Sequence, residues 1–96
     1  MSLPVVLTLE AAAEFDAASD WYQEHAKLGA AFTSHVQQAL QYIGQMPQAH
    51  PTIYRDICRV TLKQFPFNVY FRRKPHRLEV IAILHGRRDP SVWKKR

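Results

Sequence analysis

Cationic and aromatic side chains in the C-terminal half are the residues of this sequence best suited to chemistry. Arginine and lysine bind phosphates or acidic partners, an aromatic ring can stack on a base, and histidine transfers protons near neutral pH. Eight such residues form the candidate set for binding a target or a partner protein: Arg59, Lys63, Tyr70, Arg72, His85, Arg87, Arg88 and Trp93.

Five members of this set would be catalytic if the chain were a ribonuclease, namely Arg59, Lys63, Arg72, His85 and Arg87. The 2′-hydroxyl of RNA would be the nucleophile, and the cations would stabilise the charge that develops at phosphorus. A structural interpretation stands beside the catalytic one. Arginines keep an exposed sheet soluble, His85 ends a strand-like run, and Trp93 can anchor the tail on the fold.

Other classes of chemistry lack their residues here. The sequence has no nucleophile elbow, no glycine-rich phosphate loop, no HExxH motif and no pair of carboxylates in the strand-like segments. The five histidines lack zinc-ligand spacing, so we expect no metal and no cofactor. Cys58 is the single cysteine, and no signal peptide or run of about 20 apolar residues is present, so we expect a cytoplasmic protein without a membrane partner.

Charge is divided unequally along the chain. Residues 1–49 carry one lysine and five acidic residues, whereas residues 50–96 carry twelve lysines and arginines and three acidic residues. This asymmetry points to a surface for a polyanion or an acidic partner. The length of 96 residues and the hydrophobic content of 47% suit one domain over residues 1–96.

Two helices are expected before the basic half. Residues 3–9 form a short apolar strand, and Thr8 can cap the Ala- and Glu-rich helix at 10–26. Residues 30–46 carry apolar side chains at spacings of four, four and three, which is a helical pattern. Gly29 interrupts the two patterns and predicts a short connection, hence an αα-hairpin.

The hydrophobic period then changes to two, which predicts three strands at 57–63, 65–73 and 78–85. Short turns between them favour an antiparallel meander. The order strand, helix, helix, strand, strand, strand predicts an α+β fold in which the helical hairpin packs on one face of a mainly antiparallel sheet.

Alternation also assigns side chains to the two faces of this sheet. In the last strand it places Ala82 and Leu84 against the helices and His85 on the opposite face. The same rule puts the other cationic residues and one tyrosine of the strands on that opposite face. We therefore expect an uncovered groove that is lined by Arg59, Lys63, Tyr70, Arg72 and His85, with Arg87 and Arg88 at its end.

Nearly the whole chain resembles the RelE/ParE superfamily of toxins from bacterial type II toxin–antitoxin modules. The resemblance is carried in order by "WYQEH", "LGAAF", "IGQMPQAHP", Arg59, "FPFNVYFR" and "VIAILHGRRDPSVWKKR". It implies the same β-α-α-β-β-β fold. It also implies a cognate antitoxin whose C-terminal segment wraps the toxin in a hetero-oligomer.

The resemblance leaves three functions open. A ParE-like toxin would bind and poison DNA gyrase, and this is our first hypothesis because "HGRRDPSVWKKR" is similar to ParE-type and plasmid-stabilisation members. A RelE-like toxin would be an enzyme that cleaves messenger RNA on the ribosome. No tyrosine follows Tyr70 to match the late tyrosine that RelE-type members often use, although His85, Arg87 and Arg88 could substitute. A degenerate member would be non-toxic and bind only an antitoxin-like partner.

Overall fold

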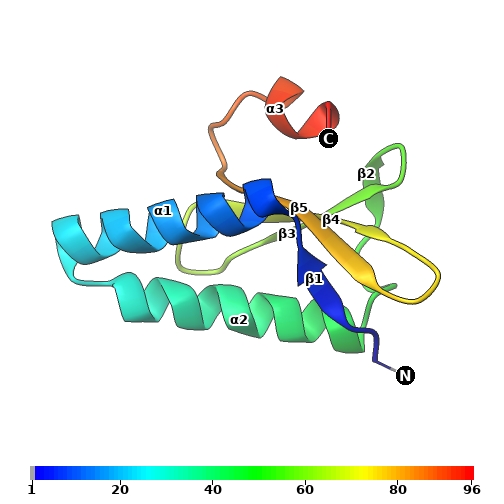
Figure 1. Ribbon diagram of the computed structural model, residues 1–96, viewed down its shortest axis with the longest axis horizontal. Helices are drawn as coiled ribbons and strands as arrows, with labels where there is room; N and C mark the ends of the chain where they lie inside the picture. The colour runs from blue at the N-terminus through cyan, green and yellow to red at the C-terminus, as the bar shows by residue number, and fades with distance from the viewer. Residues whose placement is uncertain (1) are drawn as a thin grey trace.

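A five-stranded sheet with helices on both faces makes up the computed structural model, which describes residues 2–96 (Figure 1). The elements in chain order are β1 (Val5–Leu7), α1 (Leu9–Ala26), α2 (Gly29–Gln45), β2 (Thr52–Tyr54), β3 (Ile57–Thr61), β4 (Phe67–Arg73), β5 (Leu78–His85) and α3 (Ser91–Lys94). The predicted α+β order is confirmed. Two short elements, β2 and α3, were not expected from the sequence.

The strands lie in the order β1-β5-β4-β3-β2. β1 pairs with β5 in parallel, and the other three pairings are antiparallel, as a mainly antiparallel sheet requires. β2 joins β3 through a tight turn in which Arg55 has φ of 52°. The two residue pairs between β2 and β3 add an edge strand that was not among the predicted strands.

The ends of α1 follow from local hydrogen bonding. The Thr8 side chain accepts a hydrogen bond from the Ala11 N–H at 3.2 Å, which confirms the predicted N-cap. At the other end Lys27, rather than Gly29, takes the left-handed conformation with φ of 55°. Gly29 is the first residue of α2, and a Cβ there would lie only 3.1 Å from the Ser19 carbonyl oxygen. The glycine is therefore needed for close packing of the two helices.

The helical hairpin covers one face of the sheet and encloses the main core. α2 contributes the fully buried Phe32, Val36 and Ile43, and β4 contributes Val69 and Phe71. These residues follow the periods of four and two that the sequence displays. Within residues 2–96, no helix combines the length and the hydropathy that crossing a bilayer requires.

A β-bulge in β5 changes the predicted faces of its C-terminal half. Phe71 pairs with Val80 and Tyr70 pairs with Ala82, so Ile81 is an extra residue between them. An inserted residue shifts the alternation by one, and every later side chain changes face. The prediction that Ala82 and Leu84 lie against the helices is therefore wrong. Both belong to a second core on the opposite face.

The opposite face is also not uncovered, in contrast to the prediction. α3 lies across it, on the side away from the hairpin (Figure 1), and buries Trp93 to 5% exposure. The second core under α3 contains Ile57, Tyr70, Ile81, Ala82, Leu84 and Trp93. The basic tail is thus an ordered cover whose tryptophan anchors it, as the sequence indicated.

Candidate partner-binding site

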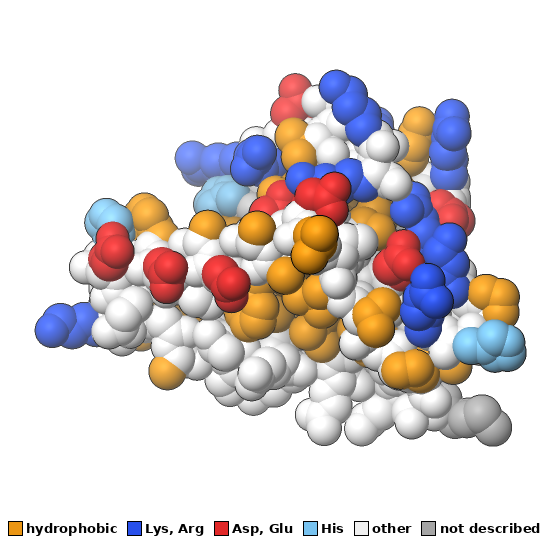
Figure 2. Space-filling view, viewed as in Figure 1, with side chains coloured by type: hydrophobic (Ala, Val, Ile, Leu, Met, Phe, Trp, Pro, Cys, Tyr) orange, Lys and Arg blue, Asp and Glu red, His pale blue; other side chains and the backbone are white. Residues whose placement is uncertain are grey.

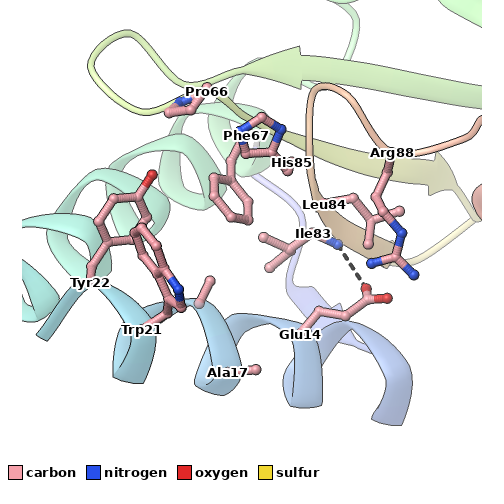
Figure 3. A pocket seen from close by; sticks show the side chains of 11 residues that line it. Glu14, Ala17, Trp21, Tyr22, Pro66, Phe67, Ile83, Leu84, His85 and Arg88 are labelled. Carbon is pink, nitrogen blue, oxygen red and sulfur yellow. Dashed lines mark hydrogen bonds between the residues drawn. The ribbon is translucent and has the colours of Figure 1, made fainter. Parts of the chain in front are cut away.

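A cleft of about 630 Å³, here called the α1 cleft, opens between α1 and the adjoining ends of β4 and β5 (Figure 3). Its walls are largely apolar. The apolar lining consists of Ala17, Ala18, Trp21, Tyr22, Pro66, Phe67, Ile83 and Leu84, and three polar residues, Glu14, His85 and Arg88, complete it. An apolar cleft with a few polar groups is the usual form of a binding site.

Two aromatic residues of α1 give the cleft a firm wall. Trp21 is 54% exposed, and its ring stacks on His25 with 4.4 Å between ring centroids. Tyr22 packs edge-on against Phe67, at 6.0 Å between centroids, and burial raises the pKa of its hydroxyl. A large exposed tryptophan held by its neighbours is the kind of residue that anchors a protein partner.

The turn after β5 supplies the basic side of the cleft. The His85 ring lies edge-on to Phe67 at 5.5 Å, and its Nδ1 accepts a hydrogen bond from the Arg87 N–H at 3.1 Å. The accepting role of Nδ1 leaves the ring proton of neutral His85 on Nε2. The Arg88 N–H donates to the His85 carbonyl, which tightens the turn and leaves the Arg88 side chain at the cleft. This edge suits an acidic group of a partner.

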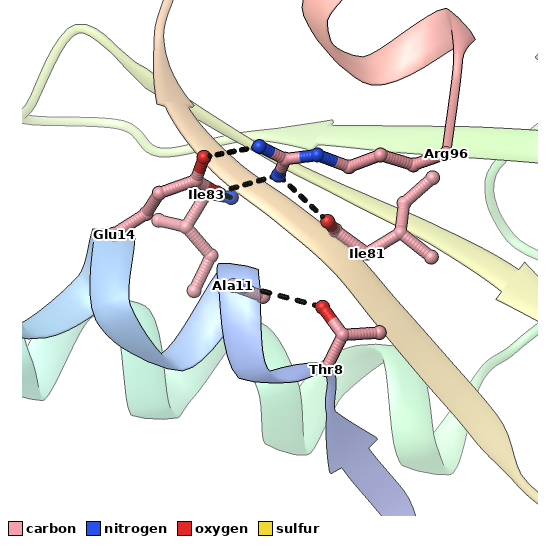
Figure 4. A network of polar contacts seen from close by, with 6 residues as sticks. All are labelled: Thr8, Ala11, Glu14, Ile81, Ile83 and Arg96. Atoms are coloured by element: carbon pink, nitrogen blue, oxygen red, sulfur yellow. Dashed lines mark hydrogen bonds and ion pairs between the residues drawn. The ribbon is translucent and has the colours of Figure 1, made fainter.

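Glu14 connects the cleft to the end of the chain (Figure 4). Its carboxylate receives two hydrogen bonds from the Arg96 guanidinium, at 2.8 and 3.0 Å, and one from the Ile83 N–H at 3.1 Å. Arg96 also donates to the Ile81 carbonyl oxygen at 3.0 Å. The hydrogen bond to Glu14 raises the pKa of Arg96, in the direction expected for a charge-assisted pair. We call this contact the Glu14–Arg96 clamp.

Four of the predicted site residues lie on the opposite face, and three of them, Tyr70, Arg72 and Trp93, have structural roles. Tyr70 is 4% exposed and stacks on Trp93 at 4.6 Å between centroids. Arg72 is bound by Asp56 at 3.2 Å and donates to the Arg96 carbonyl oxygen at 3.0 Å. Arg59 lies opposite Tyr70 in the β3–β4 register and is exposed.

Lys63 and His85 do not join this group, so the predicted common groove is wrong. β3 ends at Thr61, which leaves Lys63 in the turn that follows, where it lines a second cleft of about 530 Å³ with His35 and Tyr42 of α2. His85 faces the α1 cleft because of the bulge at Ile81. The five residues proposed for RNA cleavage are therefore distributed over both faces of the sheet.

His50 also lines the second cleft, and its Nδ1 is buried with no hydrogen-bond partner among residues 2–96. Burial lowers the pKa of His50, because desolvation disfavours the charged ring. Among residues 2–96, no three Asp, Glu, His or Cys side chains come close enough to hold a metal ion.

Charge on the surface follows the division seen in the sequence. Figure 2 shows acidic side chains in a row along α1 and lysine and arginine side chains around α3 and the far end of the sheet. The α1 cleft lies close to this boundary, because α1 forms one wall and Arg88 stands at the other.

The sequence interpretation missed Glu14 and Arg96 as a functional pair and did not select Trp21 as a site residue. A signal for Glu14 was present, because it lies three residues after Ala11 and four before Ala18, both buried. An acid on the buried side of a helix needs a partner. Nothing in the sequence identified Arg96 as that partner, since 82 residues separate them.

Comparisons with known proteins agree with this architecture. The family described as "ParE toxin of type II toxin-antitoxin system, parDE" matches residues 5–90. A chain of the solved structure "Chromosomal ParDE TA system from P. aeruginosa" is similar in fold, with a TM-score of 0.66 and 22% identity. The similarity covers 88% of this chain and 96% of that chain. No curated protein matched.

Proposed function

The chain belongs to the ParE toxin family of type II toxin–antitoxin systems, and we propose that it is a toxin that stops growth by binding DNA gyrase in the bacterial cytoplasm. The observation that supports a binding protein over a nuclease is the distribution of the cations. Arg72 is held by Asp56, and His85 and Lys63 lie away from Arg59. A cleavage site would need these groups around one phosphate.

We further propose that a cognate antitoxin neutralises the toxin by docking in the α1 cleft. The cleft offers an exposed tryptophan and an apolar floor for an apolar anchor, and Arg88 for an acidic neighbour of that anchor. An antitoxin segment with alternating apolar and acidic residues fits this chemistry. The complex would be a toxin–antitoxin hetero-oligomer.

The gyrase proposal is tested by adding purified protein to a supercoiling reaction. We expect supercoiling to stop at a protein concentration comparable to that of gyrase. Normal supercoiling at saturating protein would refute the proposal. Mapping of messenger RNA ends after induction separates the alternatives, because new cleavage sites would indicate a ribonuclease. An induced culture that grows normally would indicate a non-toxic member.

The antitoxin proposal is tested by purifying the toxin in complex with the small protein encoded beside its gene. The affinity between the two proteins is then measured for the wild type and for toxin variants. Trp21→Ala should weaken binding by roughly 30-fold, as loss of a central aromatic anchor does. Tyr42→Ala is the matched control, because Tyr42 is an exposed aromatic of α2, 46% exposed, outside the α1 cleft. Equal affinities for the two variants would place the antitoxin elsewhere on the toxin.

A further inference from the structure

Three aromatic rings beside α3 form a continuous support for cations. Tyr70 and Trp93 stack at 4.6 Å, and Tyr54 meets Trp93 edge-on at 6.1 Å. The Lys94 Nζ stands 4.9 Å from the centre of the Tyr54 ring, and the Arg55 guanidinium carbon stands 5.4 Å from it. Cation–π attraction therefore holds both charges above one ring.

Arg59 extends this group along the sheet. It pairs with Tyr70 in the register of β3 and β4, so its side chain stands beside the stacked rings. Arg55, Arg59 and Lys94 are exposed, and within residues 2–96 their side chains make no ion pair or hydrogen bond. We name the surface of Arg55, Arg59 and Lys94 over the three rings the α3 face.

The acidic residues near the α3 face are already engaged. Asp56 pairs with Arg72 at 3.2 Å, and Glu14 pairs with Arg96 at 2.8 Å. The Asp89 carboxylate accepts a hydrogen bond from the Ser91 N–H at 2.9 Å, and this bond is the main cause of its lowered pKa. The positive charge of Arg55, Arg59 and Lys94 is thus left without a bound internal counter-charge, although Lys94 also acts on Asp89 through space.

We infer that the α3 face binds the phosphate backbone of a nucleic acid duplex. Several uncompensated cations spread over one face are suited to a polyanion, because each phosphate contact releases condensed counterions. The gyrase proposal does not require this site. A toxin bound to gyrase would, however, lie close to the duplex on which gyrase acts.

The α3 face should recognise the charge of the phosphates and not the bases. Trp93 and Tyr70 are 5% and 4% exposed, so neither ring is free to stack on an unpaired base. The remaining ring, Tyr54, carries the two cations on its surface. Binding should therefore be independent of sequence and should not favour single strands. An acidic peptide fits this face less well, because the apolar space beneath it is filled by the protein's own Trp93.

The test uses fluorescence anisotropy with labelled DNA duplexes over a series of salt concentrations. We expect dissociation constants near 10⁻⁵ M at physiological salt, typical of non-specific binding. The variant Arg55→Asn, Arg59→Gln, Lys94→Gln should flatten the plot of log K against log salt by about 2.7, which is 0.9 for each lost phosphate contact. Asparagine is chosen at position 55 because it tolerates the positive φ.

A charge-matched control removes three exposed cations elsewhere, with Lys27→Gln, Lys74→Gln and Arg77→Gln. This variant should bind duplex DNA within about two-fold of the wild type, and the salt slope should stay the same. Equal losses in both variants, or no binding by the wild type at low salt, would overturn the inference.

Further binding measurements distinguish a phosphate backbone from other ligands of the α3 face. Duplex RNA should bind comparably to duplex DNA if phosphates alone are read, and single-stranded DNA should bind more weakly. Competition by polyglutamate as effective as that by DNA would refute a phosphate site and indicate an acidic protein partner. Supercoiling is assayed separately. Intact gyrase inhibition by a wild-type protein that binds no duplex would overturn only the inference drawn from the α3 face.

Discussion

Removal of one member of the Glu14–Arg96 clamp should lower the free energy of unfolding by more than an ordinary surface ion pair does. The perturbations are Glu14→Gln, Arg96→Met and the double variant. Glutamine removes the charge but keeps an oxygen that can accept from the Ile83 N–H, so the substitution isolates the ion pair. Methionine keeps most of the methylene packing of arginine.

The magnitude follows from burial and geometry. The side chains of Arg96 and Glu14 are 22% and 19% exposed, and their two hydrogen bonds are 2.8 and 3.0 Å long. Exposed pairs contribute 0–1 kcal/mol, and breaking a buried pair costs 3–5 kcal/mol. For a pair that is mostly but not fully buried, we expect each single variant to lose about 2 kcal/mol, with a coupling energy of about 1.5 kcal/mol.

The assay is urea unfolding at pH 7, followed by far-UV circular dichroism. A second measurement follows Trp93 fluorescence in a Trp21→Phe background, where Trp93 is the remaining tryptophan. If the clamp holds α3 on the sheet, Trp93 should report its transition at lower urea than the far-UV signal in both single variants. Coincident transitions would show that α3 stays docked without the clamp.

The Arg77–Glu79 pair provides a matched control within the same chain. Its N–O distance is 3.2 Å, and the Arg77 side chain is 53% exposed. A cycle with Arg77→Met and Glu79→Gln should give a coupling energy of about 0.5 kcal/mol or less. The reasoning would be refuted if the Glu14–Arg96 cycle were additive, or if its coupling equalled that of the control.

Three further changes test other parts of the fold. Trp93→Ala should destabilise the protein by roughly 3–5 kcal/mol in urea unfolding, because the variant exposes Tyr70 and the second core. Burial depresses the pKa of His50 below 6.5, so its neutral form is favoured in the folded state and stability should fall as pH drops below 6.5. His50→Gln should therefore destabilise less at pH 5.5 than at pH 7.5, in paired urea titrations. Gly29→Ala should lower the melting temperature, because the new Cβ would lie 2.9 Å from the Gln23 Cβ and 3.1 Å from the Ser19 carbonyl oxygen. Gly86→Ala, whose nearest neighbour would be 3.6 Å away, should leave the melting temperature within error.

Regular elements could be predicted because their signals are local. The spacing of Phe32, Val36 and Ile43 fixes one face of α2, and all three are fully buried. Thr8 caps α1 through a contact three residues away. One prediction, the position of the break between the two helices, was wrong by only two residues. Gly29 was interpreted as the break in the hairpin, but Lys27 adopts the left-handed backbone there with the aid of hydrogen bonds to Gln23 and Tyr22.

The contacts that build the candidate site could not be predicted, because they join distant parts of the chain. Glu14 meets Arg96 only after α1 and α3 have both been placed beside β5. α3 itself has four residues, too few for a hydrophobic period, and it is held by tertiary contacts of Trp93 and not by propensity. β2 is similarly short and is defined by its pairing with β3.

The position of His85 relative to the arginines of the opposite face depends on one residue of β5. Without the bulge, alternation would place His85 on the face that carries Arg59 and Arg72, close to the arrangement that phosphate cleavage requires. Ile81 is the inserted residue, and it turns His85 towards Phe67 and sends Leu84 to the second core. His85 therefore lies on the α1-cleft side of the sheet, away from Arg59 and Arg72, and this separation argues against their joint action on one phosphate. The same insertion places His85 beside Arg88 in the lining of the α1 cleft. An acidic partner segment would bind at this basic side of the cleft.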